Sequence, residues 1–187
     1  MSSEDKKYSL IILILSIVSF FSNLWVKDAD LMEARNFIAA REMVESGNWL
    51  IPTLNGNLRF EKPPLPTWIT AGIMKLFHNT TDEFLLRIPV AIISVILIFL
   101  IYYFVKTLTE KSLYSFIAAF ISLTTFMLIK IGNENSWDMY SYVFAFGAVV
   151  FFTAGIKKEK INSFIISGIF LACSILSKGP VALYGLT

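Results

Sequence analysis

Five long apolar segments divide the chain, and polar stretches separate them. A bilayer core takes about 20 helical residues to cross, so each segment is predicted to be a membrane-spanning helix. The segments cover residues 8–25, 84–105, 113–131, 137–156 and 161–176. The last one is short and is expected to continue past Lys178. The predicted fold class is therefore all-α, a polytopic bundle of membrane helices.

Residues 26–83 form a polar stretch that is long for a connection between two spans, and long connections are usually functional or disordered. Its pattern favours order. Residues 30–46 are predicted to form a helix, because Asp28 or Asp30 can cap its start and Gly47 takes the left-handed conformation that ends a helix. The apolar face of this helix indicates that it lies along the membrane surface.

A second short helix is predicted over residues 65–77. Pro63 and Pro64 precede it, and proline is tolerated in the first turn of a helix. Between the two helices, Pro52 and the pair Asn55-Gly56 are turn signals. The long loop is thus expected to carry two amphipathic helices that lie at the membrane surface.

Lysines in the short connections predict the orientation of the chain. All of them fall on the cytoplasmic side if the N-terminus is inside, and the long loop is then external. These lysines are Lys6, Lys7, Lys106, Lys111, Lys157, Lys158 and Lys160. The chain ends at Gly185-Leu186-Thr187, within an apolar stretch that has just begun. Residues 1–187 are therefore expected to be one domain, the N-terminal part of a longer membrane protein.

Composition supports the membrane class and excludes others. Hydrophobic residues make up 56% of the 187 residues, whereas soluble domains are nearer 45–50%. The net charge of +2 gives no case for nucleic-acid binding. Cys173 is the single cysteine, so a disulfide within the chain and a cysteine-based metal site are both excluded.

Two polar features indicate chemistry at one membrane face. Residues 59–68 are a compact basic and acidic run beside the membrane, which suits a lipid-linked substrate that carries phosphate. Asp138 stands at the external start of the fourth segment, where a carboxylate is costly and tends to be functional. The alternative is that Ser136 or Asp138 caps that helix.

An ordered series of motifs carries a family resemblance. The motifs are Glu33-Ala34-Arg35-Asn36-Phe37-Ile38-Ala39-Ala40-Arg41-Glu42-Met43, Ser46-Gly47-Asn48-Trp49-Leu50-Ile51-Pro52, Leu54-Asn55-Gly56 and Phe60-Glu61-Lys62-Pro63-Pro64-Leu65. In these motifs the chain resembles the bacterial aminoarabinose transferases that modify lipid A. They belong with the protein O-mannosyltransferases among the GT-C membrane glycosyltransferases. The resemblance extends over about residues 28–180.

The resemblance implies a GT-C fold and a glycosyltransferase of the bacterial inner membrane. Such an enzyme takes a sugar from a polyprenyl-phosphate donor at the external face and passes it to lipid A, a protein or another envelope acceptor. The first external loop forms part of the active site. Some relatives use a divalent metal and others do not, so a metal cofactor stays an open expectation. Membrane lipids are the other expected partners.

The resemblance also implies roles for cationic residues. Arg35 and Lys62 match family residues that hold the donor phosphate. Glu61 matches a neighbour that touches metal or orders the loop. Lys178, in the motif Lys178-Gly179-Pro180, matches a family lysine that could bind donor phosphate or lipid headgroups; the alternative is that it anchors a helix end in the interface.

The catalytic carboxylate departs from the family pattern. The family usually has an Asp-Glu pair at the start of the first loop helix, and this chain has Met32-Glu33. Inverting transfer needs a carboxylate to take the acceptor's proton. Asp30, Glu33 and Asp28 are candidates in that order, and Asp138 matches a family aspartate that faces the active site. The alternative is that the first three are ordinary capping and surface acids.

Three other functions compete with a glycosyltransferase. A non-enzymatic membrane scaffold could reuse the fold, and Met32 is the best support for it. A transporter would place its charged groups at the bilayer midplane, whereas here they gather at one membrane face. An oligosaccharide polymerase or ligase shares polyprenyl substrates but not this series of motifs.

Overall fold

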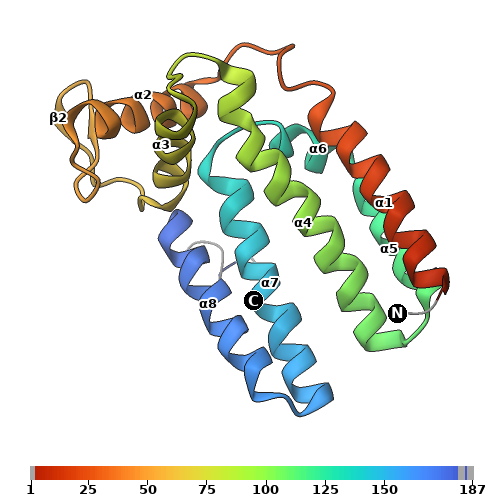
Figure 1. The fold of residues 1–187 in the computed structure, drawn as a ribbon. Helices are drawn as coiled ribbons and strands as arrows, with labels where there is room; N and C mark the ends of the chain where they lie inside the picture. The colour runs from red at the N-terminus through yellow and green to blue at the C-terminus, as the bar shows by residue number, and fades with distance from the viewer. Residues whose placement is uncertain (1–2, 181–183, 185–187) are drawn as a thin grey trace.

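The computed structural model describes residues 3–180 and 184, in which long helices lie side by side with a smaller helical layer at one end (Figure 1). The expectation about residues 185–187 lies outside the described residues. The bundle holds α1 (Ser3–Phe21), α4 (Glu83–Thr109), α5 (Ser112–Leu123), α6 (Phe126–Gly132), α7 (Trp137–Lys158) and α8 (Ile161–Lys178). The end layer holds α2 (Leu31–Ser46), β1 (Thr53–Leu54), β2 (Asn57–Leu58) and α3 (Leu65–Phe77).

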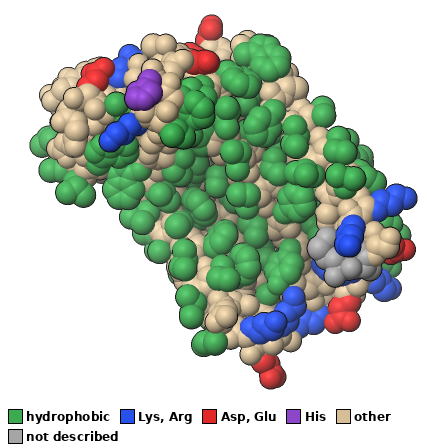
Figure 2. Space-filling model, viewed as in Figure 1, with side chains coloured by type: hydrophobic (Ala, Val, Ile, Leu, Met, Phe, Trp, Pro, Cys, Tyr) green, Lys and Arg blue, Asp and Glu red, His purple; other side chains and the backbone are tan. Residues whose placement is uncertain are grey.

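Three of the described helices, α4, α7 and α8, are long and apolar enough to cross a membrane, and the number is four if α5 and α6 together form one span. Helix α1 is not among them, since charged residues fill its first turn and shorten its apolar part. Hydrophobic side chains cover the visible flank of the long helices, and charged groups gather toward the two ends (Figure 2). This distribution suits a bilayer around the middle of the bundle.

The predicted span over residues 113–131 is two helices rather than one straight one. Helices α5 and α6 meet at an angle of 68°. The hydroxyls of Thr124 and Thr125 both donate to the carbonyl of Ile121. Side chains that bond to the backbone in this way compete with the helix ladder and bend it. The apolar pattern alone continued across the break and did not reveal it.

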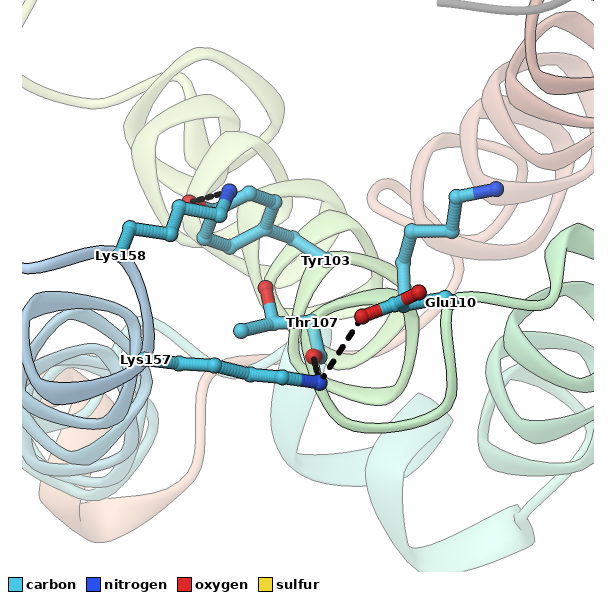
Figure 3. Close-up of a pocket in the computed structure, with 6 residues that line it drawn as sticks. Tyr103, Thr107, Glu110, Lys157 and Lys158 are labelled. Carbon is cyan, nitrogen blue, oxygen red and sulfur yellow. Dashed lines mark hydrogen bonds and ion pairs between the residues drawn. The ribbon is translucent and has the colours of Figure 1, made fainter.

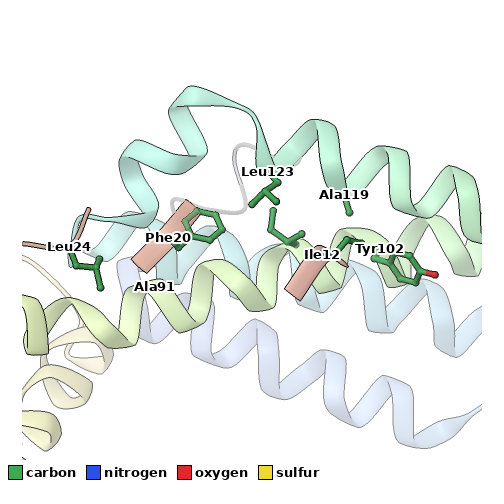
Figure 4. Close-up of a cluster of buried hydrophobic side chains, with 8 residues drawn as sticks. Ile12, Phe20, Leu24, Ala91, Tyr102, Ala119 and Leu123 are labelled. Atoms are coloured by element: carbon green, nitrogen blue, oxygen red, sulfur yellow. The ribbon is translucent and has the colours of Figure 1, made fainter. Parts of the chain in front are cut away.

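Helix α4 is the central element of the bundle, and separate apolar clusters form on two of its sides. One cluster joins it to α1 and α5 (Figure 4), and it consists of Ile12, Phe20, Leu24, Ala91, Ile98, Tyr102, Ala119 and Leu123. The other joins it mainly to α7, through buried residues such as Val90, Leu97 and Tyr140. Helix α4 is thereby held from both sides.

The two loop helices pack on each other through their apolar faces. Phe37, Ala40 and Met43 of α2 lie in one buried cluster with Ala71 and Met74 of α3. Both helices have the predicted bounds to within one residue. They therefore form a compact layer at the end of the spans.

A short hairpin connects α2 to α3. Strands β1 and β2 pair antiparallel around Asn55 and Gly56, whose φ angles of 53° and 76° match a type I′ turn. The carboxylate of Glu42 accepts hydrogen bonds from the Thr53 hydroxyl and from the Gly56 amide. The hairpin is thus fixed to α2, and it returns the chain to the bundle at Arg59.

Helices α7 and α8 form a close antiparallel pair (Figure 1). Gly147 lies against the ring of Phe170, and a Cβ atom there would overlap that ring. The Ser167 hydroxyl donates to the Ala148 carbonyl at 2.7 Å, and the Ser174 hydroxyl to the Ser141 carbonyl at 2.9 Å. Small residues and hydroxyls of this kind are what membrane helices use to approach closely.

We expect Gly147→Ala to lower the melting temperature of the detergent-solubilised protein, because overpacking of this kind costs roughly 1–3 kcal/mol. The matched control is Gly168→Ala in α8, where a Cβ meets no described atom within 4 Å. Thermal unfolding followed by circular dichroism makes the comparison. Equal melting temperatures for the two variants would contradict the close packing of α7 on α8.

Candidate functional site

The candidate site lies where residues 59–64, between the hairpin and α3, meet the start of α7. The guanidinium of Arg59 lies 4.8 Å from the centre of the Trp137 ring, and its Nη1 donates to the Arg35 carbonyl at 3.1 Å. The indole nitrogen of Trp137 donates to the Pro63 carbonyl at 3.2 Å. These contacts fix the loop segment to the first residue of a membrane helix.

Arg59 is a buried cation with unused donors. Its exposed fraction is 5%, and its Nε and Nη2 atoms have no hydrogen-bond partner among the described residues. Burial lowers the pKa of Arg59 below its ordinary value. The negative charge of Glu61 opposes this shift, and the positive charge of Arg35 adds to it. Arginine nevertheless stays protonated in proteins. Because buried donors are normally satisfied, the geometry suits an anion bound beside Arg59.

Arg59 is the first residue of the basic and acidic run 59–68, but the sequence predicts no individual role for it. Arg35 and Glu61, which were predicted to bind substrate, are close enough for their charges to act on Arg59, and Lys62 follows three residues later in the chain. Lys62 and Arg35 are half-buried, and Glu61 is exposed. Within the part of the chain that the structure describes, none of these three side chains has a hydrogen-bond or ion-pair partner, so their charges are free to meet a ligand.

Asp138 and Lys178 form an ion pair between the start of α7 and the end of α8. The Asp138 side chain is 41% exposed, so it is open to a substrate. The ammonium of Lys178 also lies 6.0 Å from the Tyr142 ring. Ser136 is the N-cap residue of α7, but no side-chain hydrogen bond caps the helix. The pairing of these two predicted site residues was not foreseen from the sequence.

Glu33 lies in a different environment from the other candidates. It is fully buried, and its carboxylate accepts hydrogen bonds from Arg87 Nε at 2.7 Å and Arg87 Nη2 at 2.9 Å. The backbone amide of Asn135 donates to it at 2.9 Å. A carboxylate enclosed in this way orders the structure around it and is poorly placed to meet an acceptor hydroxyl.

The remaining candidate carboxylates lie at the start of α2. Asp30 is the N-cap, and it accepts a hydrogen bond from the Glu33 amide at 2.8 Å. Asp28 precedes the helix and is exposed. The Met32 side chain, at the position where the family has its aspartate, is 43% exposed. The first turn of α2 therefore exposes a methionine side chain at the position where the family usually has a carboxylate.

A buried polar network joins α2 and α3 to the start of α7. Asn36 donates to the Thr70 hydroxyl at 3.2 Å and to the Asn135 carbonyl at 3.1 Å, and it accepts from the Thr67 hydroxyl at 2.9 Å. The Asn135 side chain donates to Thr70 at 3.0 Å and accepts from the Tyr140 hydroxyl at 3.0 Å. Because every member has a partner, the network rigidifies the region.

The described residues do not form a preset metal site. Among residues 3–180 and 184, no group of three or more His, Cys, Asp or Glu side chains converges closely enough to hold a metal ion. His78, the single histidine of the sequence, is the left-handed C-cap of α3 and is exposed.

Comparison with known proteins gives one family match. Residues 61–187 match the family described as dolichyl-phosphate-mannose-protein mannosyltransferase. An uncharacterized protein of Aquifex aeolicus is 32% identical over 178 residues, which cover 94% of this chain and 40% of the relative. An undecaprenyl phosphate-alpha-4-amino-4-deoxy-L-arabinose arabinosyl transferase of Proteus mirabilis is 32% identical over 163 residues. These residues cover 85% of this chain and 29% of the relative.

Solved structures show the same fold. The structure of ArnT from Cupriavidus metallidurans bound to undecaprenyl phosphate superposes with a TM-score of 0.83 at 20% identity, covering 95% of this chain and 34% of that one. The Archaeoglobus fulgidus oligosaccharyltransferase superposes with a TM-score of 0.69 at 14% identity, and the match covers 92% of this chain and 24% of that one. The predicted membrane-helical fold class of GT-C type is confirmed. The chain spans well under half the length of these relatives.

We expect Arg87→Met to destabilise the protein by about 3–5 kcal/mol, because it leaves the buried carboxylate of Glu33 without a cation. The double variant Glu33→Gln/Arg87→Met removes both charges and should recover part of that loss. Denaturant unfolding in detergent measures both. Arg41→Met is the matched control, since the Thr80 carbonyl is the one hydrogen-bond partner of Arg41 among the described residues. Equal losses in the single and double variants would show that the ion pair does not organise the loop.

Proposed function

The chain belongs to the dolichyl-phosphate-mannose-protein mannosyltransferase family, and on that premise we propose that it supplies the donor-phosphate side of a membrane glycosyltransferase. The donor is a sugar linked to a polyprenyl phosphate. The single observation that carries the proposal is the buried guanidinium of Arg59, whose Nε and Nη2 have no described partner. A phosphate oxygen is an acceptor that suits such a group.

The charges around Arg59 support an anionic ligand. Arg35 and Lys62 are half-buried cations without described ion-pair partners, and Arg59 is fixed between the Arg35 carbonyl and the Trp137 ring. Several cations held in advance near one point stabilise the charge that develops on a leaving phosphate. The relatives' names point to the same donor class, since the Proteus mirabilis enzyme uses an undecaprenyl phosphate sugar.

The transfer proceeds by displacement at the anomeric carbon of the sugar. The acceptor's hydroxyl oxygen forms a bond to that carbon, and the bond from the carbon to the phosphate oxygen breaks. The polyprenyl phosphate leaves with the electron pair and is held by Arg59, Lys62 and Arg35. The hydroxyl proton passes to a carboxylate, which acts as the general base.

We propose that Asp138 is the general base that takes the proton of the acceptor hydroxyl. Its side chain is partly exposed, it directly follows the Trp137 that covers Arg59, and its ion pair with Lys178 fixes its direction. Asp30 is the second choice, because its side chain is already used to cap α2. Glu33 acts as a positioning residue through Arg87 and Asn135, and Asp28 as a surface acid.

The protein is proposed to lie in a bacterial inner membrane with its N-terminus in the cytoplasm and the α2–α3 layer outside. The orientation is supported by lysines at the helix ends and connections that lie at the opposite end of the bundle from the candidate site. They are Lys106, Lys111, Lys157, Lys158 and Lys160. The acceptor is proposed to be a lipid such as lipid A, as the relatives' aminoarabinose transfer suggests. A protein acceptor is the second candidate, in keeping with the family description.

The first test follows consumption of a labelled polyprenyl-phosphate sugar by the full-length protein in membranes. We expect Lys62→Ala and Arg59→Gln each to lower kcat/KM about 10–100-fold, since a hydrogen bond to a charged group contributes roughly 1.5–3 kcal/mol. Lys75→Ala, an exposed lysine on α3, is the control. A folded protein that consumes no donor, whatever the sugar, would favour the scaffold or transporter functions instead.

The second test separates the two carboxylates. Asp138→Asn should lower kcat by about 10²–10⁴ while donor binding stays unchanged, which is the usual loss for a general base. Asp30→Asn should keep most of the activity, because asparagine caps a helix as well as aspartate does. Single-turnover kinetics with saturating donor measure both. A large loss of kcat in Asp30→Asn but not in Asp138→Asn would show that the general base is Asp30, at the start of α2.

A further inference from the structure

A cationic hollow lies between α4 and α7 at the end of the bundle opposite the candidate site (Figure 3). Its volume is about 270 Å³. Its lining consists of Tyr103, Lys106, Thr107, Glu110, Lys157 and Lys158. Three of these six side chains are lysines and one is acidic. Lys106 is paired with Asp5 and Lys157 with Glu110. The charge of Lys158, which no described carboxylate balances, therefore leaves the hollow positive.

The lysines are held in place by the ends of the helices. Lys157 Nζ donates to the Thr107 carbonyl at 2.6 Å and to the Leu108 carbonyl at 3.1 Å, and it lies 3.4 Å from Glu110 Oε1. Lys158 Nζ donates to the Tyr103 hydroxyl at 3.1 Å. An ammonium group has three donors, so Lys158 keeps two of them for a ligand.

An apolar groove continues from this hollow along α4 toward the middle of the bundle. Its volume is about 380 Å³, and it is lined by Ile96, Phe99, Leu100, Tyr103 and Phe151. Tyr103 belongs to both cavities: its ring lies 4.8 Å from the Lys158 ammonium and 6.0 Å from the Phe151 ring. From Ile96 to Tyr103 the groove follows α4 for roughly 10 Å, at about 1.5 Å per residue.

We propose that the hollow and the groove together bind one anionic phospholipid, with its phosphate at the lysines and an acyl chain along the groove. Basic pockets between membrane helices bind anionic headgroups, and the charge of the hollow complements a phosphate. The adjoining groove offers almost only apolar side chains at a depth where acyl chains lie. A soluble phosphate would leave the groove empty, and a zwitterionic lipid would gain less from the lysines.

The experiment measures lipid binding to the full-length protein in neutral detergent by native mass spectrometry. Phosphatidylglycerol and phosphatidylcholine with the same acyl chains are compared, and glycerol 3-phosphate serves as a soluble competitor. We expect Lys157→Gln/Lys158→Gln to weaken phosphatidylglycerol binding roughly 25-fold, about fivefold for each lysine. The control is Lys111→Gln/Lys160→Gln, which removes the same charge from exposed positions at the same end and should bind as wild type does.

A second pair of variants tests the groove. Ile96→Trp fills it and should weaken binding of the lipid, whereas Ile92→Trp lies one turn away on α4, outside the groove, and should not. Equal affinity of the wild type for the two lipids would overturn the proposal. So would displacement of the lipid by glycerol 3-phosphate together with no effect of Ile96→Trp, because the ligand would then be a soluble phosphate. Neither readout depends on the transferase activity.

Discussion

The buried ion pair between Glu33 and Arg87 is the constraint on which the rest of the structure depends. Arg87 also donates to the carbonyls of Leu24 and Lys27, at 2.7 and 2.8 Å, and to Glu83. One guanidinium thus joins the end of the first helical segment, the start of α4 and the loop helix α2. Removing two charges from water is costly unless both are paired and hydrogen-bonded. A shift of the loop layer along the spans would leave these buried charges without their partners.

The candidate site follows from that position of the loop layer. The Asn135 amide bonds to Glu33, and Asn135 stands just before α7, so the same carboxylate that fixes α2 also fixes the turn that leads to Trp137 and Asp138. Trp137 in turn covers Arg59. Arg59 of the loop is therefore held beside the first residue of α7, and Asp138 is the next residue of that helix. A polar site of this kind is held in advance by groups that do not themselves react.

The sequence predicted well what depends on local chemistry. The bounds of α2 and α3 follow from the capping Asp30, the left-handed Gly47 and the prolines before residue 65, all of which act within a few residues. The features that the sequence did not predict depend on contacts between residues that are far apart in the chain. Glu33 looked like a free acid because Arg87 is 54 residues away, and Arg59 has a role only once it is buried against Trp137. The membrane-length apolar pattern likewise gave no sign of the bend between α5 and α6.

The methionine at position 32 explains why the chemistry is assigned to α7. A side chain there points outward from the first turn of α2, where the helix dipole would favour a carboxylate, but a thioether can take no proton. Its neighbour Glu33 points inward to Arg87 and is already used for folding. Asp30 is used as the cap. Asp138 is partly exposed and is paired with a cation rather than enclosed, which is why we propose that a transferase built on this chain draws its base from the start of α7.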